Sequence, residues 1–222
     1  LFSFCGITRR SAQSAKAVGE LLELQPNGTF ATTANNEAQS ANGECRATYE
    51  LASSDILMRR DGHGGRSIQN LHVFQNGSLA HSISEPKAAD LYISNSGMLA
   101  LMEVEIHNVD GAKVHFVSQT GATLHRVAFK RASGFAFSTD GNSFGVNADG
   151  SLHVINPLNK TRTLYPEADQ FAIQNQLVAT SKGKKLTVYE NNTELFSAET
   201  GFLYPRAIAV SADQNSLAVI DK

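Results

Sequence analysis

Residues 135–157 read FAFSTDGNSFGVNADGSLHVINP, and this stretch decides the fold. Apolar and small residues alternate at 135–137 and again at 144–146, on either side of the polar turn sequence 139–142. A third apolar run, 152–155, follows a second Asp-Gly turn. Alternation with a period of two predicts half-buried strands, and Asp-Gly between such runs predicts a tight hairpin. The stretch therefore predicts three short antiparallel strands joined by tight turns.

The same alternation recurs along the chain in two forms. Hairpins with a polar turn between two apolar strands are expected at 21–32, 71–83, 114–128, 152–165 and 186–198. Strand pairs of a second kind are expected at 47–59, 91–102, 134–146, 171–180 and 206–220. One pair and one hairpin make a four-stranded unit, and such units bury their faces by packing side by side around an axis.

The recurrence therefore predicts an all-β chain, a β-propeller of four-stranded antiparallel blades with about five blades, or part of a larger propeller. Residues 1–19 are expected to be a lead-in and residues 20–222 the propeller. The repeat units are expected at about 45–86, 87–132, 133–168, 169–203 and 204–222, the last completed by 20–34. Two interpretations of the ends stay open. Either the first hairpin closes the ring, or Lys222 is a processing point within a larger propeller.

The turn in the central stretch also resembles a known repeat. Residues 137–144, FSTDGNSF, are similar to the WD40-like propeller repeats of the TolB and YVTN type, whose inner strands end in Ser-x-Asp-Gly before an apolar strand. Looser copies are 210–218, VSADQNSLA, and 93–100, ISNSGMLA. The resemblance covers most of the chain from Ala47 onward. It implies a propeller fold and no single activity, because such folds serve enzymes, receptors and scaffolds alike.

Composition bounds the classes of partner. The chain has 19 basic and 21 acidic residues, a formal net charge of -2, so no overall positive field attracts nucleic acid or an anionic membrane surface. No run of apolar residues is long enough to span a bilayer. A protein partner is therefore the expected one, with no nucleic acid and no membrane span.

The first residues and the two cysteines each allow two interpretations. The apolar segment 1–7, LFSFCGI, is either the tail of a secretory signal or an ordered tail packed on the domain. Cys5 and Cys45 are either bridged, which would tie the tail to the first unit, or two independent thiols. Both alternatives stay open.

One candidate ligand site is the mouth of the propeller channel. Asp90, Asp169 and Arg206 stand just before successive inner strands, and inner strands line the channel of a propeller. Three charged residues at matched positions are expected to converge on that mouth and to bind a polar ligand there. Surface ion pairs are the alternative explanation.

Two loops carry candidate metal ligands. The stretch 103–110 holds carboxylates and a histidine of the kind that bind Ca²⁺ or another cation, namely Glu103, Glu105, His107 and Asp110. In the equivalent loop of the preceding unit, 59–66, Asp61 and His63 are flanked by glycines. Three further histidines, His72, His115 and His153, share one register in successive hairpins, and equivalent positions in different blades lie too far apart to bind one metal.

These observations favour a secreted, periplasmic or cell-surface propeller that acts as a protein-interaction or adhesion scaffold. One alternative is a lactonase-like hydrolase with a divalent cation at the channel mouth. Another is the propeller portion of a longer surface protein. The sequence shows no Ser-His-Asp order and no Gly-rich phosphate loop, so it offers no positive evidence for catalysis and predicts no cofactor other than the possible Ca²⁺.

Overall fold

The structure, a computed structural model, describes residues 22–24, 30–32, 36–58, 64–84, 86, 88–104, 112–166, 168–200, 207–211 and 213–220. Throughout these ranges every regular element is a β-strand. The chain separates into two compact units, an N-terminal unit of Gln13–Ala128 and a C-terminal unit that contains Phe129–Lys222. Each unit is described by itself below.

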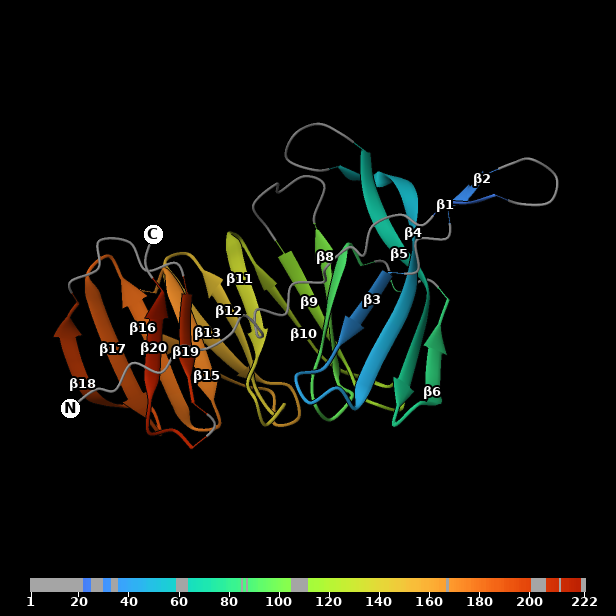
Figure 1. The fold of residues 1–222 in the computed structure, drawn as a ribbon. Helices are drawn as coiled ribbons and strands as arrows, with labels where there is room; N and C mark the ends of the chain where they lie inside the picture. Colours follow the sequence, from blue (N-terminus) through green and yellow to red (C-terminus); the bar gives the residue numbers. More distant parts are fainter. Residues whose placement is uncertain are drawn as a thin grey trace. The chain divides into compact units, whose positions relative to one another are not determined.

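The N-terminal unit contains two four-stranded sheets and a short hairpin (Figure 1). The hairpin pairs β1 (Leu22–Leu24) with β2 (Phe30–Thr32). The first sheet consists of β3 (Asn36–Gln39), β4 (Cys45–Met58), β5 (Gly64–Gln75) and β6 (Ser78–Ile83). The second consists of β7 (Asp90–Ile93), β8 (Leu99–Val104), β9 (Ala112–Val117) and β10 (Thr123–Phe129). In both sheets the strands are neighbours in chain order, which is the meander of a propeller blade.

The C-terminal unit repeats this meander. Its first sheet consists of β11 (Ala132–Phe137), β12 (Phe144–Ala148), β13 (Ser151–Asn156) and β14 (Thr161–Tyr165). Its second consists of β15 (Gln170–Gln174), β16 (Leu177–Lys182), β17 (Lys185–Glu190) and β18 (Thr193–Glu199). A final pair joins β19 (Ala207–Val210) to β20 (Leu217–Ile220). The predicted all-β architecture of four-stranded antiparallel blades is confirmed.

A serine at the first position explains why the same tight turn recurs. In the turn between β11 and β12 the backbone N–H of Ser143 donates to Ser138 Oγ at 3.0 Å, and Gly141 adopts a φ of +73°. The turn between β19 and β20 repeats the bond, from the N–H of Ser216 to Ser211 Oγ at 2.9 Å. The serine oxygen thus satisfies a backbone donor that the turn would otherwise leave unpaired. This turn is the one on which the resemblance to WD40-like repeats rests.

Apolar residues of successive sheets pack against one another within each unit. In the N-terminal unit Leu71 and Val73 of β5 share a core with Leu91 and Ile93 of β7. In the C-terminal unit the β12 backbone approaches β15 so closely that a Cβ at Gly145 would lie 2.5 Å from the Phe171 ring. Core therefore forms between neighbouring blades, as expected for units that cannot bury their faces alone.

One predicted strand pair is wrong. Residues 47–51 and 55–59 were expected as two strands, but β4 runs without a turn from Cys45 to Met58, and the strand before it is β3. The intervening Ala-Ser-Ser lacks the glycine or asparagine that tight hairpin turns favour, whereas Asn42-Gly43 has both, and Gly43 adopts a φ of +76°. The first four-stranded sheet therefore begins with β3 at Asn36.

The predictions for the ends of the chain are not tested. The lead-in and Cys5 lie outside the described residues. The hairpin β1–β2 and the pair β19–β20 form separate two-stranded sheets in different compact units, so completion of one blade by the other stays a prediction. In the described part of the chain we find no helix with the length and apolar character needed to cross a membrane.

Candidate functional site

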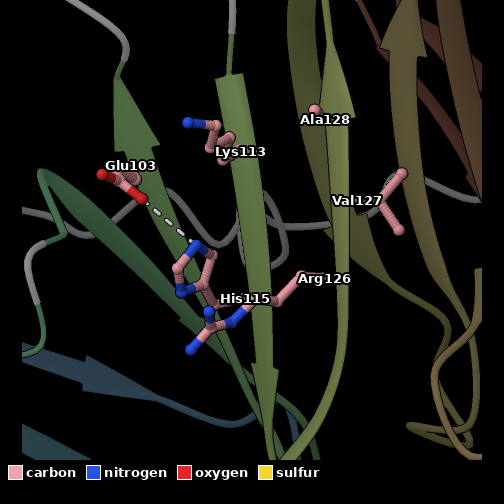
Figure 2. Close-up of a pocket in the computed structure, with 6 residues that line it drawn as sticks. All are labelled: Glu103, Lys113, His115, Arg126, Val127 and Ala128. Carbon is pink, nitrogen blue, oxygen red and sulfur yellow. Dashed lines mark ion pairs between the residues drawn. The ribbon is translucent and has the colours of Figure 1, made fainter.

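An open pocket of about 310 Å³ lies on strands β8, β9 and β10 of the N-terminal unit (Figure 2). We call it the His115 pocket, and its lining residues are Glu103, Lys113, His115, Arg126, Val127 and Ala128. Two cations, a carboxylate and an imidazole thus surround one concave surface that also has an aliphatic part.

Strand alternation places these side chains together. In β9 the residues Ala112, Val114 and Phe116 are buried, so Lys113 and His115 between them point to the other face of the strand. Lys113 pairs in register with Glu103 of β8, which sets the carboxylate beside the histidine. The third strand, β10, neighbours β9 and contributes the remaining lining residues. The polar wall of the pocket therefore follows from the same period of two that builds the sheet.

Glu103 and His115 form the central contact of the pocket. Glu103 Oε2 lies 3.1 Å from His115 Nε2, and the two side chains are 32% and 20% exposed. An ionised carboxylate only accepts hydrogen bonds, so Nε2 carries the proton and Nδ1 is left as an acceptor. Burial lowers the pKa of His115, Arg126 lowers it further, and Glu103 opposes both. The ring is therefore neutral at pH 7.

The chemistry of the pocket is that of polar recognition. A carboxylate–imidazole pair activates a nucleophile in many hydrolases, but no serine, threonine or cysteine is among the described residues that line this pocket. Figure 2 shows the Arg126 side chain reaching toward the His115 ring. Glu103 contacts the opposite edge of that ring. Charged donors with no nucleophile among the lining residues suit a bound anion or polar group better than a covalent reaction.

The predicted metal site is only partly within the described structure. Glu103 is described, and its carboxylate contacts His115 instead of other acidic groups. Glu105, His107 and Asp110 lie outside the described residues, as do Asp61 and His63 of the preceding loop. Across the described residues no group of three or more metal-ligating side chains occurs. A Ca²⁺ site at 103–110 stays a prediction.

The predicted channel-mouth residues have separate local partners. Asp90 Oδ1 accepts the backbone N–H of Leu91 at 2.8 Å, and burial raises the pKa of this carboxyl above its usual value. Asp169 accepts from Lys182 Nζ at 2.7 Å, which is the surface ion pair named as the alternative. Arg206 lies outside the described residues, and Asp90 and Asp169 belong to different units. Their convergence stays a prediction.

The three register-matched histidines have different partners. His72 Nδ1 lies 2.8 Å from Ser82 Oγ, His115 faces Glu103, and His153 accepts hydrogen bonds from Arg162. No common ligand is indicated for the histidines.

The Cys45 thiol is buried and donates to the backbone oxygen of Asn95 at 3.4 Å. Cys5 lies outside the described residues, so a bridge between Cys5 and Cys45 stays a prediction.

Sequence reasoning missed the exposed apolar residues of the outermost strands. The last strand of three sheets carries a leucine that is more than half exposed, namely Leu79 in β6, Leu164 in β14 and Leu195 in β18. Strand β18 is exposed at every position. Apolar alternation alone predicts that these leucines are buried. The signal that would have indicated their exposure is that each strand is the last one of its four-stranded sheet.

No protein-family model and no curated protein matches the chain. Solved structures do match. Hsv2 of Kluyveromyces marxianus superposes with a TM-score of 0.56 at 9% identity, over 84% of this chain and 57% of that one. Hsv2p of Kluyveromyces lactis gives 0.56 at 10% identity, over 84% and 56%. The β-propeller domain of the Trilobed protease from Pyrococcus furiosus gives 0.51 at 11% identity, over 73% and 57%.

The chain therefore spans little more than half the length of each of these structures. At such low identity the likeness concerns the fold, which agrees with the four-stranded meanders of both units. The chain has a β-propeller fold, as its resemblance to WD40-like repeats implied.

Proposed function

We propose that this chain is a protein-interaction module that contacts its partner through the outermost strands of its blades. The observation that carries the proposal is β18, which is exposed along its whole length although it contains Leu195 and Phe196. These two side chains are 54% and 43% exposed. Adjacent apolar side chains left in water on an edge strand are typical of contact surfaces.

The pairing of β17 with β18 places a bulge at these two side chains. Val188 pairs with Phe196 and Tyr189 pairs with Glu194, so Leu195 is the extra residue of a β-bulge. A bulge re-aims the side chains that follow it, and here it breaks the alternation that would send Leu195 and Phe196 to opposite faces. The edge also offers backbone N–H and C=O groups, which an extended partner segment uses when it adds a strand to a sheet.

A location outside the cytoplasm, as a secreted, periplasmic or cell-surface adhesion scaffold, belongs to the same proposal. It is supported by the resemblance of the Ser-x-Asp-Gly turn at 138–141 to TolB- and YVTN-type repeats. Fractionation of cells that produce the natural full-length protein tests it. Recovery in the secreted or envelope fraction is expected, and recovery only with cytoplasmic proteins would contradict it.

The test of the contact surface is capture of partners with a matched set of variants. The double variant L195S/F196S removes the apolar edge, and L158S changes a leucine that is equally exposed (56%) but lies in the turn after β13. Chemical crosslinking in cells that produce the protein, followed by mass spectrometry, identifies proteins joined to each variant. We expect at least one partner crosslinked at β18 that the wild type and L158S retain and the double variant loses roughly tenfold or more.

Equal capture by all three proteins would overturn the proposal, as would lactone hydrolysis that depends on an added divalent cation. Circular dichroism and a thermal melt show that each variant is folded before the comparison. Because both substituted residues are already exposed, their replacement should leave the melting temperature nearly unchanged.

A further inference from the structure

We propose that the His115 pocket binds a carboxylate group carried on a small apolar group. The proposal goes beyond the contact surface on β18, because it concerns a different set of residues and a different chemistry. It rests on the charges that line the pocket, on the unused hydrogen-bond donors of Arg126, and on the aliphatic part of the pocket wall.

The charges of the pocket leave room for one negative charge. Lys113 and Arg126 are cationic, Glu103 is anionic and His115 is neutral at pH 7, so the lining carries a net charge of about one positive. The Glu103 carboxylate accepts from His115, and Lys113 is the residue directly opposite Glu103 on β9, so these two opposite charges are neighbours on one face of the sheet. The charge that remains is that of Arg126.

Arg126 is placed to bind an anion. Its side chain is exposed and reaches toward His115, where its positive charge lowers the pKa of the ring. Within the described residues its guanidinium has no hydrogen bond or ion pair, so its planar set of donors is available. A guanidinium donates two parallel hydrogen bonds to one carboxylate, which is the geometry that an ammonium group cannot supply.

The remaining walls select a carboxylate over a phosphate. Among the described residues that line the pocket, Lys113 and Arg126 are the only cations, and Lys113 already stands opposite Glu103. A second negative charge on the ligand would therefore lie near Glu103, and like charges a few ångströms apart repel. Ala128 lies two residues after Arg126 in β10 and so shares its face of the strand, where it adds an aliphatic group to the pocket wall. A methyl or methylene next to a carboxylate therefore matches the pocket, and such groups occur at the C-terminus of a peptide and in aspartate or glutamate side chains.

His115 makes the proposed binding sensitive to pH. The groups that face its ring are Glu103, Lys113 and Arg126. Protonation of Nδ1 adds a donor and a positive charge on the side of the ring that Glu103 does not occupy, so a bound carboxylate favours the protonated ring. Binding should therefore tighten as the pH falls through the pKa of His115, and the ligand should raise that pKa.

The test is an NMR titration of the purified protein, with the His115 ring signals assigned by their loss in H115Q. One probe is N-acetylalanine, whose free C-terminal carboxylate stands next to a methyl group. A second is N-acetylaspartate methylamide, whose only carboxylate is on the side chain. N-acetylalanine amide and inorganic phosphate are the negative probes. We expect saturable shifts with the carboxylates, and the better of the two identifies the source as a chain end or an acidic side chain.

The variants make the assignment specific. R126Q should weaken carboxylate binding roughly tenfold or more, because it removes a charge-assisted pair of hydrogen bonds. R126K should fall between R126Q and the wild type, since it keeps the charge without the planar fork. K184Q, which removes an exposed charge in the turn before β17, and L195S/F196S on β18 should bind like the wild type.

Three outcomes would overturn the proposal. The first is that phosphate binds as tightly as the carboxylates, and the second is that the carboxylates give no saturable shift. The third is that R126Q binds carboxylates as tightly as K184Q does. The β18 double variant separates this proposal from the proposed function. If it loses its protein partners and still binds carboxylates normally, both proposals stand. If one of the two experiments fails, the other can still be interpreted.

Discussion

His115 and His153 occupy the same register in two successive blades, yet their surroundings are opposite. His115 Nε2 lies 3.1 Å from the Glu103 carboxylate in an open pocket, whereas His153 is only 7% exposed. His153 Nδ1 accepts hydrogen bonds from Arg162 Nε at 2.9 Å and Nη2 at 2.7 Å. Repetition therefore fixes where the backbone places a side chain, and the residues on neighbouring strands decide what that side chain does.

Both rings carry the proton on Nε2, but their Nδ1 atoms have different surroundings. His153 Nε2 lies 3.3 Å from the Ala148 carbonyl, so it carries the proton, as His115 Nε2 does. The acceptor Nδ1 is filled by Arg162 in the one case, and in the other it has no partner among the described residues. The Nδ1 atom of His153 is hydrogen-bonded and its ring lies against an aromatic ring, so this histidine is part of the packing of the blade. The Nδ1 atom of His115 is open beside Arg126, so this histidine lies on a candidate binding surface.

The largest effect should come from removing the aromatic ring that encloses His153. Phe129, the first residue of the C-terminal unit, is buried, lies 5.4 Å from the His153 ring between centroids, and has the Arg162 guanidinium 5.1 Å from its own centroid. Phe129→Ala should lower the free energy of unfolding by about 3–4 kcal/mol, because it leaves a cavity and loses these contacts. Urea unfolding measures it.

Leu164→Ala is the matched control for this change. Leu164 pairs in register with His153 but is 57% exposed, so its loss should cost less than about 0.5 kcal/mol. Equal costs for the two variants would mean that His153 is not held in the packed environment described here.

A smaller loss should follow removal of the cation that distinguishes the two histidines. Arg162→Gln deletes the hydrogen bonds to His153 Nδ1 and the contact with the Phe129 ring. Arg162 itself is exposed, so water replaces part of what is lost, and the expected cost is about 1 kcal/mol. Thermal and urea unfolding check it. A cost above that of Phe129→Ala would reverse the proposed order of contributions.

Much of the fold, and little of the site, could be predicted from the sequence. Turns with a serine, an Asx residue and a glycine, such as 138–141, are local, so sequence places the strands around them. The exception was β4, where the small and polar residues at 52–55 suggested a turn that the longer strand passes through. Arg126 and Glu103 meet His115 through pairing between strands, and no spacing in the chain reports that meeting.

The sharpest contrast between the histidines is the sign of a pKa change. Burial first, and then a neighbouring arginine, lowers the pKa of both rings, while Glu103 raises that of His115. Glu103→Gln should therefore lower the pKa of His115 further, and Arg162→Gln should raise that of His153. NMR titration of the ring C–H signals measures both in one experiment. Shifts of the same sign would remove the proposed difference between the two sites.

The same shifts set how stability depends on pH. A histidine whose pKa is lower in the folded chain binds fewer protons there than in the unfolded chain. Its contribution is therefore fully present above the unfolded pKa of about 6.5 and is lost as the pH falls toward the folded value. Unfolding measured between pH 7.5 and about 5 should show this loss, with a shallower dependence in Arg162→Gln than in the wild type.

The smallest effect concerns the Glu103–His115 pair. Both side chains are partly exposed, at 32% and 20%, so water screens their attraction and solvates either group when the other is removed. Glu103→Gln keeps the size of the side chain and an acceptor oxygen for Nε2–H, and it should change the free energy of unfolding by less than about 0.5 kcal/mol. Urea unfolding with Glu199→Gln on the exposed strand β18 as the control measures it. A loss near that of Arg162→Gln would show that this pair stabilises its blade as His153 does, and the pocket would then be part of the packing and not a surface kept open for a ligand.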